Sequence, residues 1–148
     1  MNRLTLLCNI VDLTTQCGHE TDQTEALRMN CWLRKGDWKI DLLPLGATLT
    51  ESLSAEVVVA YKRATDAVTE RKSSYRAWHS WALINFRLAE QSDERSTIVR
   101  SHIIAAVKGF VRAISVGTKR WSASVQQDML NLLSCLFKYG GELEDVAS

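Results

Sequence analysis

Three things are scarce in this sequence: proline, long hydrophobic runs and an excess of charge of one sign. A single Pro among 148 residues, with few strand-like alternations, favours a chain built of helices. No apolar run approaches the roughly 18 residues that a membrane span requires, so we expect none. The 18 basic and 17 acidic side chains nearly cancel and give no overall field for attracting nucleic acid, which we do not expect as a partner. Any anion site must therefore be local.

The cysteines lack the close pairing of a disulfide scaffold or a zinc site. With no CxxC pair, reduced thiols in the cytosol or nucleus are the simpler interpretation. A metal quartet can be drawn from three cysteines and His19, but structural zinc sites bring their ligands in closely spaced pairs. We therefore expect no metal site, and buried thiols instead. The cysteines are Cys8, Cys17, Cys31 and Cys135, of which the first three would form the quartet.

The apolar residues recur mostly at intervals of three and four, the spacing of one face of a helix. We therefore predict an all-α chain of five or six helices, whose 148 residues form one helical-repeat segment of ordinary domain size. A connector at about 37–50 contains Pro44, which disfavours helix at the residue before it. The expected helices cover about 3–17, 21–36, 50–71, 74–90, 94–116 and 123–139.

The first and last expected helices each have an apolar stripe. An isolated piece of a helical repeat lacks capping helices, so it exposes apolar edges at both ends. We expect such edges here. The stripes are Leu4, Leu7, Ile10 or Val11, and Thr14 in the first helix, and Val125, Met129, Leu132, Leu133 and Leu136 in the last.

An aromatic and small-residue pattern in the middle of the chain is typical of the tetratricopeptide repeat, a pair of packed helices. In "CWLRKGDW", an aromatic, a glycine and a second aromatic follow the order that closes the first helix of such a repeat. The match is partial, because Trp81 and Ala82 stand where the pattern has Leu and Gly. It predicts a tetratricopeptide-like superhelix, an α-solenoid. Its packing residues are Trp32, Gly36, Trp38, Ala60, Ala64, Ala67, Trp78, Trp81 and Ala82.

The stretch "YRAWHSWALINF" places His79 between two tryptophans. A catalytic histidine needs a hydrogen-bonded carboxylate, Ser or Cys, and no residue one turn away on the helix is of this kind. We therefore predict no catalytic residue and expect His79 to pack between helices. Trp78 and Trp81 lie three residues apart on one side of the helix. Core packing between helix pairs is favoured there over an aromatic cage for a peptide or methylated lysine.

Four consecutive landmarks resemble the FAT domain of target-of-rapamycin (TOR) kinases, which are phosphatidylinositol-3-kinase-related serine/threonine protein kinases. They are "CWLRKGDW", "AYKRATDAVTERKSSYRAWHSWALINF", "AAVKGFVRAIS" and "LFKYGG", and the resemblance covers about residues 25–146. Between the fourth and fifth expected helices, where family members often carry a long low-complexity insert, only "EQSDERSTIVR" is present. The resemblance implies part of a helical-repeat clamp around a kinase domain.

The chain itself contains no Gly-rich phosphate loop, no Asp-x-x-x-x-Asn catalytic loop and no Asp-Phe-Gly triplet, which phosphoryl transfer needs. We therefore expect this segment not to be an enzyme, although its parent would be a kinase. The resemblance implies a scaffold that packs on the kinase domain and further repeats, and presents surface to TOR complex subunits in growth signalling. It implies a cytoplasmic location, with endomembranes or the nucleus reached through the parent complex. The alternative is a stand-alone tetratricopeptide-like adaptor for a peptide or protein partner.

The best candidate site is ionic, because basic residues end one repeat-leading helix and flank the start of the next. Such a cluster repels itself unless it is solvated or bridged by a polyanion. FAT domains of TOR kinases have a basic pocket for an inositol polyphosphate, and Arg34 and Arg76 stand at matching positions, whereas Asn30 replaces a third basic residue. No cofactor is required, and the implied ligand is inositol hexakisphosphate. Further members of the cluster are Lys35, Lys39 and Lys72.

Overall fold

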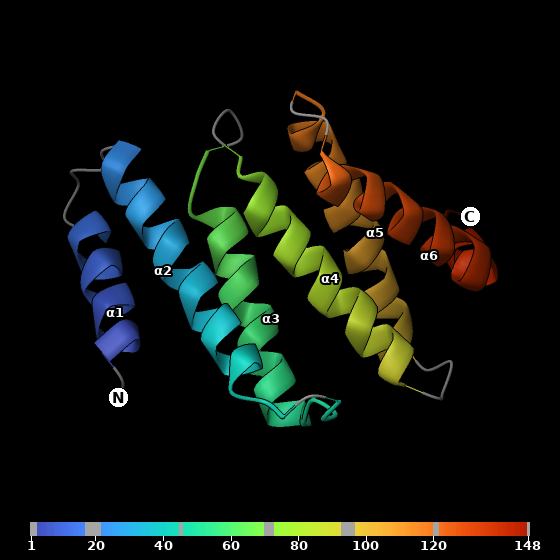
Figure 1. Ribbon diagram of the computed structural model, residues 1–148, viewed down its shortest axis with the longest axis horizontal. Helices are drawn as coiled ribbons and strands as arrows, with labels where there is room; N and C mark the ends of the chain where they lie inside the picture. Colours follow the sequence, from blue (N-terminus) through green and yellow to red (C-terminus); the bar gives the residue numbers. More distant parts are fainter. Residues whose placement is uncertain are drawn as a thin grey trace. The chain divides into compact units, whose positions relative to one another are not determined.

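The computed structural model of the chain describes residues 3–16, 22–44, 46–69, 73–92, 97–119 and 122–147. Within those ranges there are six helices and no strand, which confirms the predicted all-α helical-repeat class (Figure 1). The chain divides into two compact units, Met1–Ser73 and Ser74–Ser148. The helices are α1 (Arg3–Gln16), α2 (Asp22–Asp41), α3 (Glu51–Asp66), α4 (Tyr75–Gln91), α5 (Thr97–Gly117) and α6 (Ala123–Ala147).

In the first unit, α2 packs against α1 on one side and α3 on the other (Figure 1). Helix α3 begins behind Thr50, whose hydroxyl accepts a hydrogen bond from the Leu53 amide at 3.3 Å. This cap satisfies one of the amides that a helix start leaves without an intrahelical partner. Every third or fourth residue of α3 is then buried: Val57, Ala60, Tyr61, Ala64 and Thr65.

The expected end of α2 at Gly36 is wrong, because the helix continues to Asp41 and the connector begins at Leu42. A Cβ atom on Gly36 would lie 2.5 Å from Cε1 of Tyr61, so the glycine allows the ring of α3 to lie directly on α2. The Tyr61 hydroxyl donates a 2.7 Å hydrogen bond to Oδ1 of Asp37. Glycine is a common signal for a helix end, but here it marks a close approach between two helices.

In the second unit, α4 and α5 form a hairpin and α6 packs on α5. Ser74 caps α4 by accepting a 3.4 Å hydrogen bond from the Ala77 amide. The two core helices approach most closely at Gly109, where a Cβ atom would lie 2.8 Å from Cβ of Ala82. The core has two clusters of buried residues: Ala82, Ala106, Phe110 and Cys135, and Ala89, Val99, Ile103 and Tyr139.

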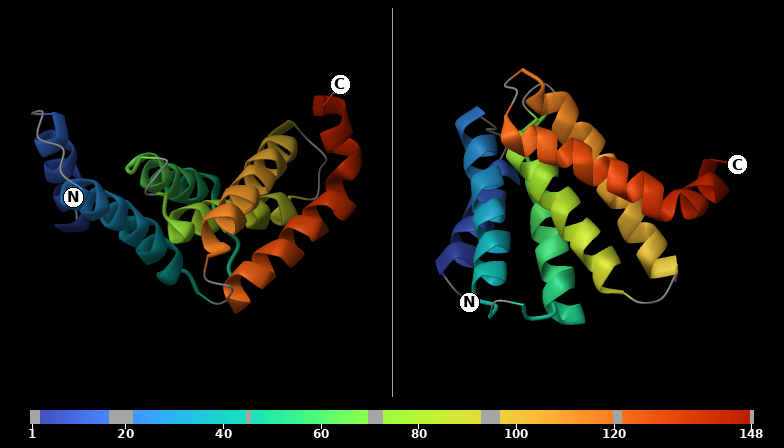
Figure 2. Two further views of the ribbon diagram at one scale, coloured as in Figure 1. Left: turned by 90° about the horizontal axis from the view of Figure 1, so that it is seen from above. Right: turned by 45° about the vertical axis from the view of Figure 1, so that its right-hand side comes forward.

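Helix α6 is bent at Tyr139, whose backbone angles (φ −121°, ψ 16°) are not helical (Figure 2). The predicted helix end near Gly140 therefore coincides with a change of direction. The buried face of α6 differs from the predicted stripe, because Met129, Leu133 and Leu136 are exposed in this chain. Two members of the stripe do face inward, since Val125 is buried and Leu132 packs against the core, and they are joined there by Asp128, Cys135 and Tyr139.

Two members of the predicted stripe of α1 are described, and both face outward. Cys8 is fully buried against the unit, whereas Leu7 and Ile10 are exposed. The side chains of Leu4, Val11 and Thr14 lie outside the described part of the chain. Across the described residues, no helix combines the length and apolar character needed to cross a bilayer.

Candidate functional site

Most of the residues predicted to pack the helix pairs are buried within their own unit. In the first unit these are Trp32, Gly36 and the three alanines of the α3 stripe, Ala60, Ala64 and Ala67. Trp38 differs, since 52 % of its surface is exposed. It lies two residues beyond Gly36, about 200° around the helix, and so on the face away from α3. In the second unit Trp81 and Ala82 are buried and Trp78 is half-buried.

His79 has a partner that its neighbours in sequence do not reveal. Its Nδ1 lies 2.8 Å from Oδ1 of Asp128, and the Tyr75 hydroxyl donates to Oδ2 of the same carboxylate at 2.7 Å. Asp128 is fully buried, and the rings of Tyr75 and His79 are stacked 5.2 Å apart. Burial, with the bond to Asp128, raises the pKa of the Tyr75 phenol. The histidine thus packs between helices as expected, but its Nδ1 is held by a carboxylate.

This network fastens α6 to α4 through side chains 49 residues apart in the chain. An aspartate oriented on Nδ1 of a histidine is also half of a catalytic arrangement, which would need a nucleophile on the other ring nitrogen. No Ser or Cys of the described residues makes that bond to His79. Sequence reasoning missed Asp128, although one signal was present: it is a charged residue three positions after Val125, on the same helix face.

A second histidine contact, partly buried, joins α4 to α5. Nδ1 of His102 lies 2.9 Å from Oδ1 of Asn85, whose amide nitrogen donates to the Trp81 carbonyl at 2.8 Å. Because Asn85 uses its Oδ1 as an acceptor, Nδ1 of His102 is the protonated nitrogen of the neutral ring. Desolvation lowers the pKa of His102, so the seam of this hairpin holds the imidazole uncharged.

The predicted basic set is divided between the two units. Arg34 and Arg76 are exposed, on α2 and α4 respectively, and Lys72 lies outside the described residues. Lys35 and Lys39 turn toward α3: Lys35 lies over the Trp32 ring, 5.0 Å from its centroid, and Lys39 pairs with Glu56. The lysines therefore belong to a different face of α2 from Arg34.

The face of α2 that holds these lysines is the floor of a groove, which we call the α2 groove. It consists of two hollows, of about 460 and 180 Å³, that share Trp32. Along α2 its floor residues follow the helical spacing i, i+4, i+7 and i+11, so they form one stripe. The floor is Arg28, Trp32, Lys35 and Lys39, and the walls include Thr5 and Asp12 of α1 and Ala55, Glu56, Val59, Arg63 and Asp66 of α3.

Charges line the groove, and its acidic side chains are all paired. Asp12 lies 3.8 Å from Arg28, Asp66 pairs with Lys62 at 2.8 Å, and Glu56 pairs with Lys39. The hydrogen bond from Lys39, together with its charge, lowers the pKa of Glu56. The guanidinium of Arg63 lies 4.6 Å from the centroid of the Trp32 ring, which also carries Lys35. Two cations thus lie near one indole, and each is in range of a favourable cation–π interaction.

No group of three or more potential metal ligands occurs among the described residues. Of the quartet considered above, Cys17 and His19 lie outside those residues, while Cys8 and Cys31 are buried. Burial raises the pKa of the Cys8 thiol to about 12, and the neighbouring Cys31 adds to the shift. The protonated thiol is a poor metal ligand and a poor nucleophile.

Comparison with known proteins identifies the chain's family. A model of the FAT domain matches residues 7–134. The serine/threonine-protein kinase tor1 of Schizosaccharomyces pombe is 31 % identical over 94 % of the chain, and TOR2 of Saccharomyces cerevisiae is 26 % identical over 83 %. The rice kinase TOR is 27 % identical over 97 % of the chain. The chain spans about 6 % of the length of these relatives. It belongs to the FAT domain family, as found in TOR serine/threonine kinases.

Proposed function

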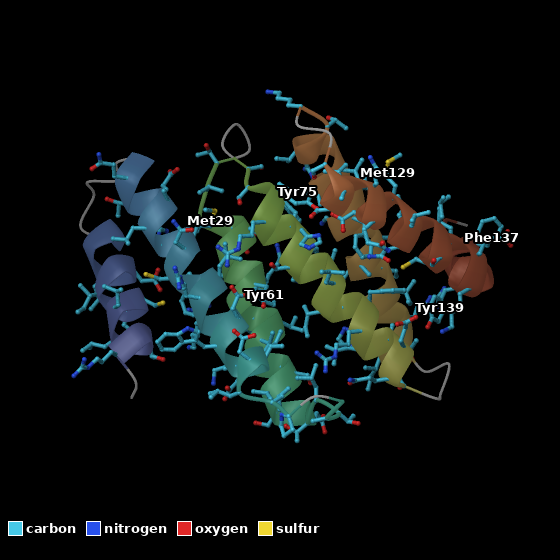
Figure 3. The ribbon with its side chains drawn as sticks, in the orientation of Figure 1. Met29, Tyr61, Tyr75, Met129, Phe137 and Tyr139 are labelled. Carbon is cyan, nitrogen blue, oxygen red and sulfur yellow. The ribbon has the colours of Figure 1, made fainter. Side chains whose placement is uncertain are left out.

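We propose that this chain is a non-catalytic scaffold segment of a TOR-type kinase, which packs on the kinase domain and neighbouring repeats and presents surface to complex subunits. The observation that supports this most is the outer face of α6. Phe137, 88 % exposed, points outward there (Figure 3), and Leu130, Leu133 and Leu136 are exposed as well. Such a stripe on the last helix is suited to another helix, because apolar side chains in water are stabilised by burial.

The same stretch of α6 lacks exposed charge. Between Ala123 and Phe137 the one charged residue is Asp128, and it is buried. In a chain with 24 % charged residues, fifteen helical positions without an exposed charge favour burial in a larger assembly.

Helix α1 has a matching feature in the first unit. In the described part of the chain it packs mainly on α2, and Leu6, Leu7, Ile10 and Leu13 are exposed. Two terminal helices with uncovered apolar faces are expected of a segment cut from a longer array of repeats. A stand-alone adaptor needs polar outer faces on these helices, so this alternative is the weaker one. Coding DNA that continues on both sides into further repeats and a kinase domain would exclude it.

A segment exchange tests the scaffold role. The chain replaces the matching segment of the Schizosaccharomyces pombe relative, and peptide phosphorylation by the purified chimera is measured. We expect activity, and its loss when Leu133→Glu and Phe137→Glu place two charges in the apolar face. The matched control is Gln127→Glu with Ser134→Glu, at exposed polar positions of the same helix that flank the apolar stripe. If both double variants are equally active, α6 has no covering helix and the proposal is wrong.

Inositol hexakisphosphate binding through Arg34 and Arg76 stays a prediction. It is supported by the exposure of both residues, whereas Lys35 and Lys39 are engaged on the α3 side, Lys35 near Trp32 and Lys39 with Glu56. Titration calorimetry of the folded chain with this ligand tests it. We expect heat that the pair Arg34→Ala and Arg76→Ala abolishes. Absence of heat in the wild type, or unchanged binding by the double variant, overturns the prediction.

A further inference from the structure

We propose that the α2 groove binds an acidic peptide segment, whose carboxylates contact Lys35 and Arg63 next to Trp32. This site is distinct from the pair Arg34 and Arg76, and it does not depend on the scaffold role. The groove opens between α1 and α3, with α2 as its floor, all within the first unit.

The charge of the groove determines the class of ligand. Its acidic side chains are neutralised by Arg28, Lys39 and the neighbouring Lys62. Within the described part of the chain, Lys35 and Arg63 form no ion pair and lie instead against the Trp32 ring. Two cations that form no ion pair in one groove favour an anionic ligand, because a charge-assisted hydrogen bond is stronger in a partly enclosed site than on an open surface.

The spacing of these cations fits an extended peptide. Both lie within 5.0 Å of the centroid of the same ring, so they are at most about 10 Å apart. In an extended chain, side chains two residues apart point to the same side at about 7 Å. The flexible side chains of Lys35 and Arg63 can adjust the distance between the two cations to the spacing of the peptide's acidic residues. A pair of acidic residues with one residue between them therefore matches the groove.

An apolar wall continues the groove beyond Lys35. Ala55 and Val59 lie there, one turn apart on α3, and Val59 is exposed. This hollow, about 460 Å³, is large enough for one aliphatic side chain. The ligand is thus a short segment with two acidic residues followed by an apolar one, each separated by a single residue.

A labelled peptide with the sequence Glu-Ala-Glu-Ala-Leu tests the proposal by fluorescence anisotropy with the full chain. We expect saturable binding that weakens as salt is added, since the contacts are between charges in partial contact with solvent. The same peptide with Gln in place of both Glu residues should not bind. This comparison uses wild-type protein and is therefore independent of how any variant folds.

Substitutions then locate the site. The variant Lys35→Gln with Arg63→Gln should bind the acidic peptide about tenfold more weakly. The matched control, Arg34→Gln with Lys108→Gln, removes the same charge at exposed positions outside the groove and should change affinity less than twofold. No saturable binding, equal binding of the Gln peptide, or equal losses in both variants overturns the proposal. A groove variant that changes the mass of the protein in solution also overturns it, and indicates a second copy as the occupant.

Discussion

The two units contain the same helix hairpin with different seams. In the first, Gly36 faces the ring of Tyr61, whose hydroxyl is bound by Asp37. In the second, Gly109 faces Ala82, and the polar groups of the seam are two half-buried histidines and their partners. Both hairpins need a position without a side chain, but one accommodates a movable ring and the other a neighbouring helix backbone.

This difference predicts unequal tolerance. A ring can turn aside when its neighbour grows, whereas a backbone can move only if the whole helix moves. The charged contacts of the two units also differ in exposure. Those of the α2 groove are partly exposed, whereas Asp128 in the second unit is fully buried. We therefore expect the second unit to respond more strongly to substitution at its seam. Four experiments test this, from the largest expected effect to the smallest.

Removal of His79 should have the largest effect. His79→Leu leaves the buried carboxylate of Asp128 without its imidazole partner, and we expect a loss of about 3 kcal/mol in the free energy of unfolding. Urea denaturation measures the loss, and hydrogen exchange locates it in α4 and α6. The counterpart in the first unit, Tyr61→Phe, removes one partly exposed hydrogen bond and should cost about 1 kcal/mol. Equal costs would show that the two seams do not differ in this respect.

Gly109→Ala should destabilise the second unit by about 2 kcal/mol, because the new methyl group meets the Ala82 backbone as well as its side chain. The Cα of Ala82 would lie 3.1 Å from the added carbon. Gly141→Ala is the control, since a Cβ there meets nothing within 4 Å. The control should be neutral or stabilising by up to about 1 kcal/mol, as alanine favours a helix. Thermal unfolding of both variants gives the comparison, and similar melting temperatures would contradict it.

Gly36→Ala should cost less, about 1 kcal/mol, although its Cβ would lie closer to its neighbour, at 2.5 Å. The neighbour is the edge of the Tyr61 ring, which can swing away at the expense of its bond to Asp37. Combining Gly36→Ala with Tyr61→Leu should recover part of the loss, as measured by a double-mutant cycle. If the losses of stability from the two substitutions are additive, the Tyr61 ring does not move aside for the alanine.

The smallest of these effects is a loss of stability of the second unit at acidic pH, which we attribute to His102. Its folded pKa lies below the ordinary value of 6.5, so below that pH the unfolded chain binds the proton more readily than the folded chain. The contribution to stability is present above pH 6.5 and is lost as the pH falls through the lowered folded pKa. His102→Gln should flatten this part of the pH profile of the melting temperature. An unchanged profile would assign the pH dependence to another group.

The fold class and the helix pairs could be predicted from the sequence, because they depend on local spacing and on capping residues such as Thr50 and Ser74. The end of α2 could not be predicted with the same rules. Glycine permits both a helix end and a close helix contact, and only the position of Tyr61 distinguishes the two for Gly36.

The candidate sites were predictable to a smaller extent. The sequence identified Lys35 and Lys39 as basic residues near Arg34. Adjacent residues of a helix are rotated by about 100° about its axis, so Lys35 lies on a different face of α2 from Arg34. The contribution of Arg63 could not be foreseen, because it reaches Trp32 from a different helix.

By itself, the sequence determined that the chain is all-α, roughly where its helices lie and which stripes of them are apolar, although α2 and α6 extend beyond their expected ends to Asp41 and Ala147. Only the tertiary structure decided which stripe faces inward, as the burial of Asp128 and the exposure of Phe137 show for α6. The physical reason is that helix formation depends on neighbours within a turn or two. The partner of a side chain such as His79 lies 49 residues away and is set by how the helices pack.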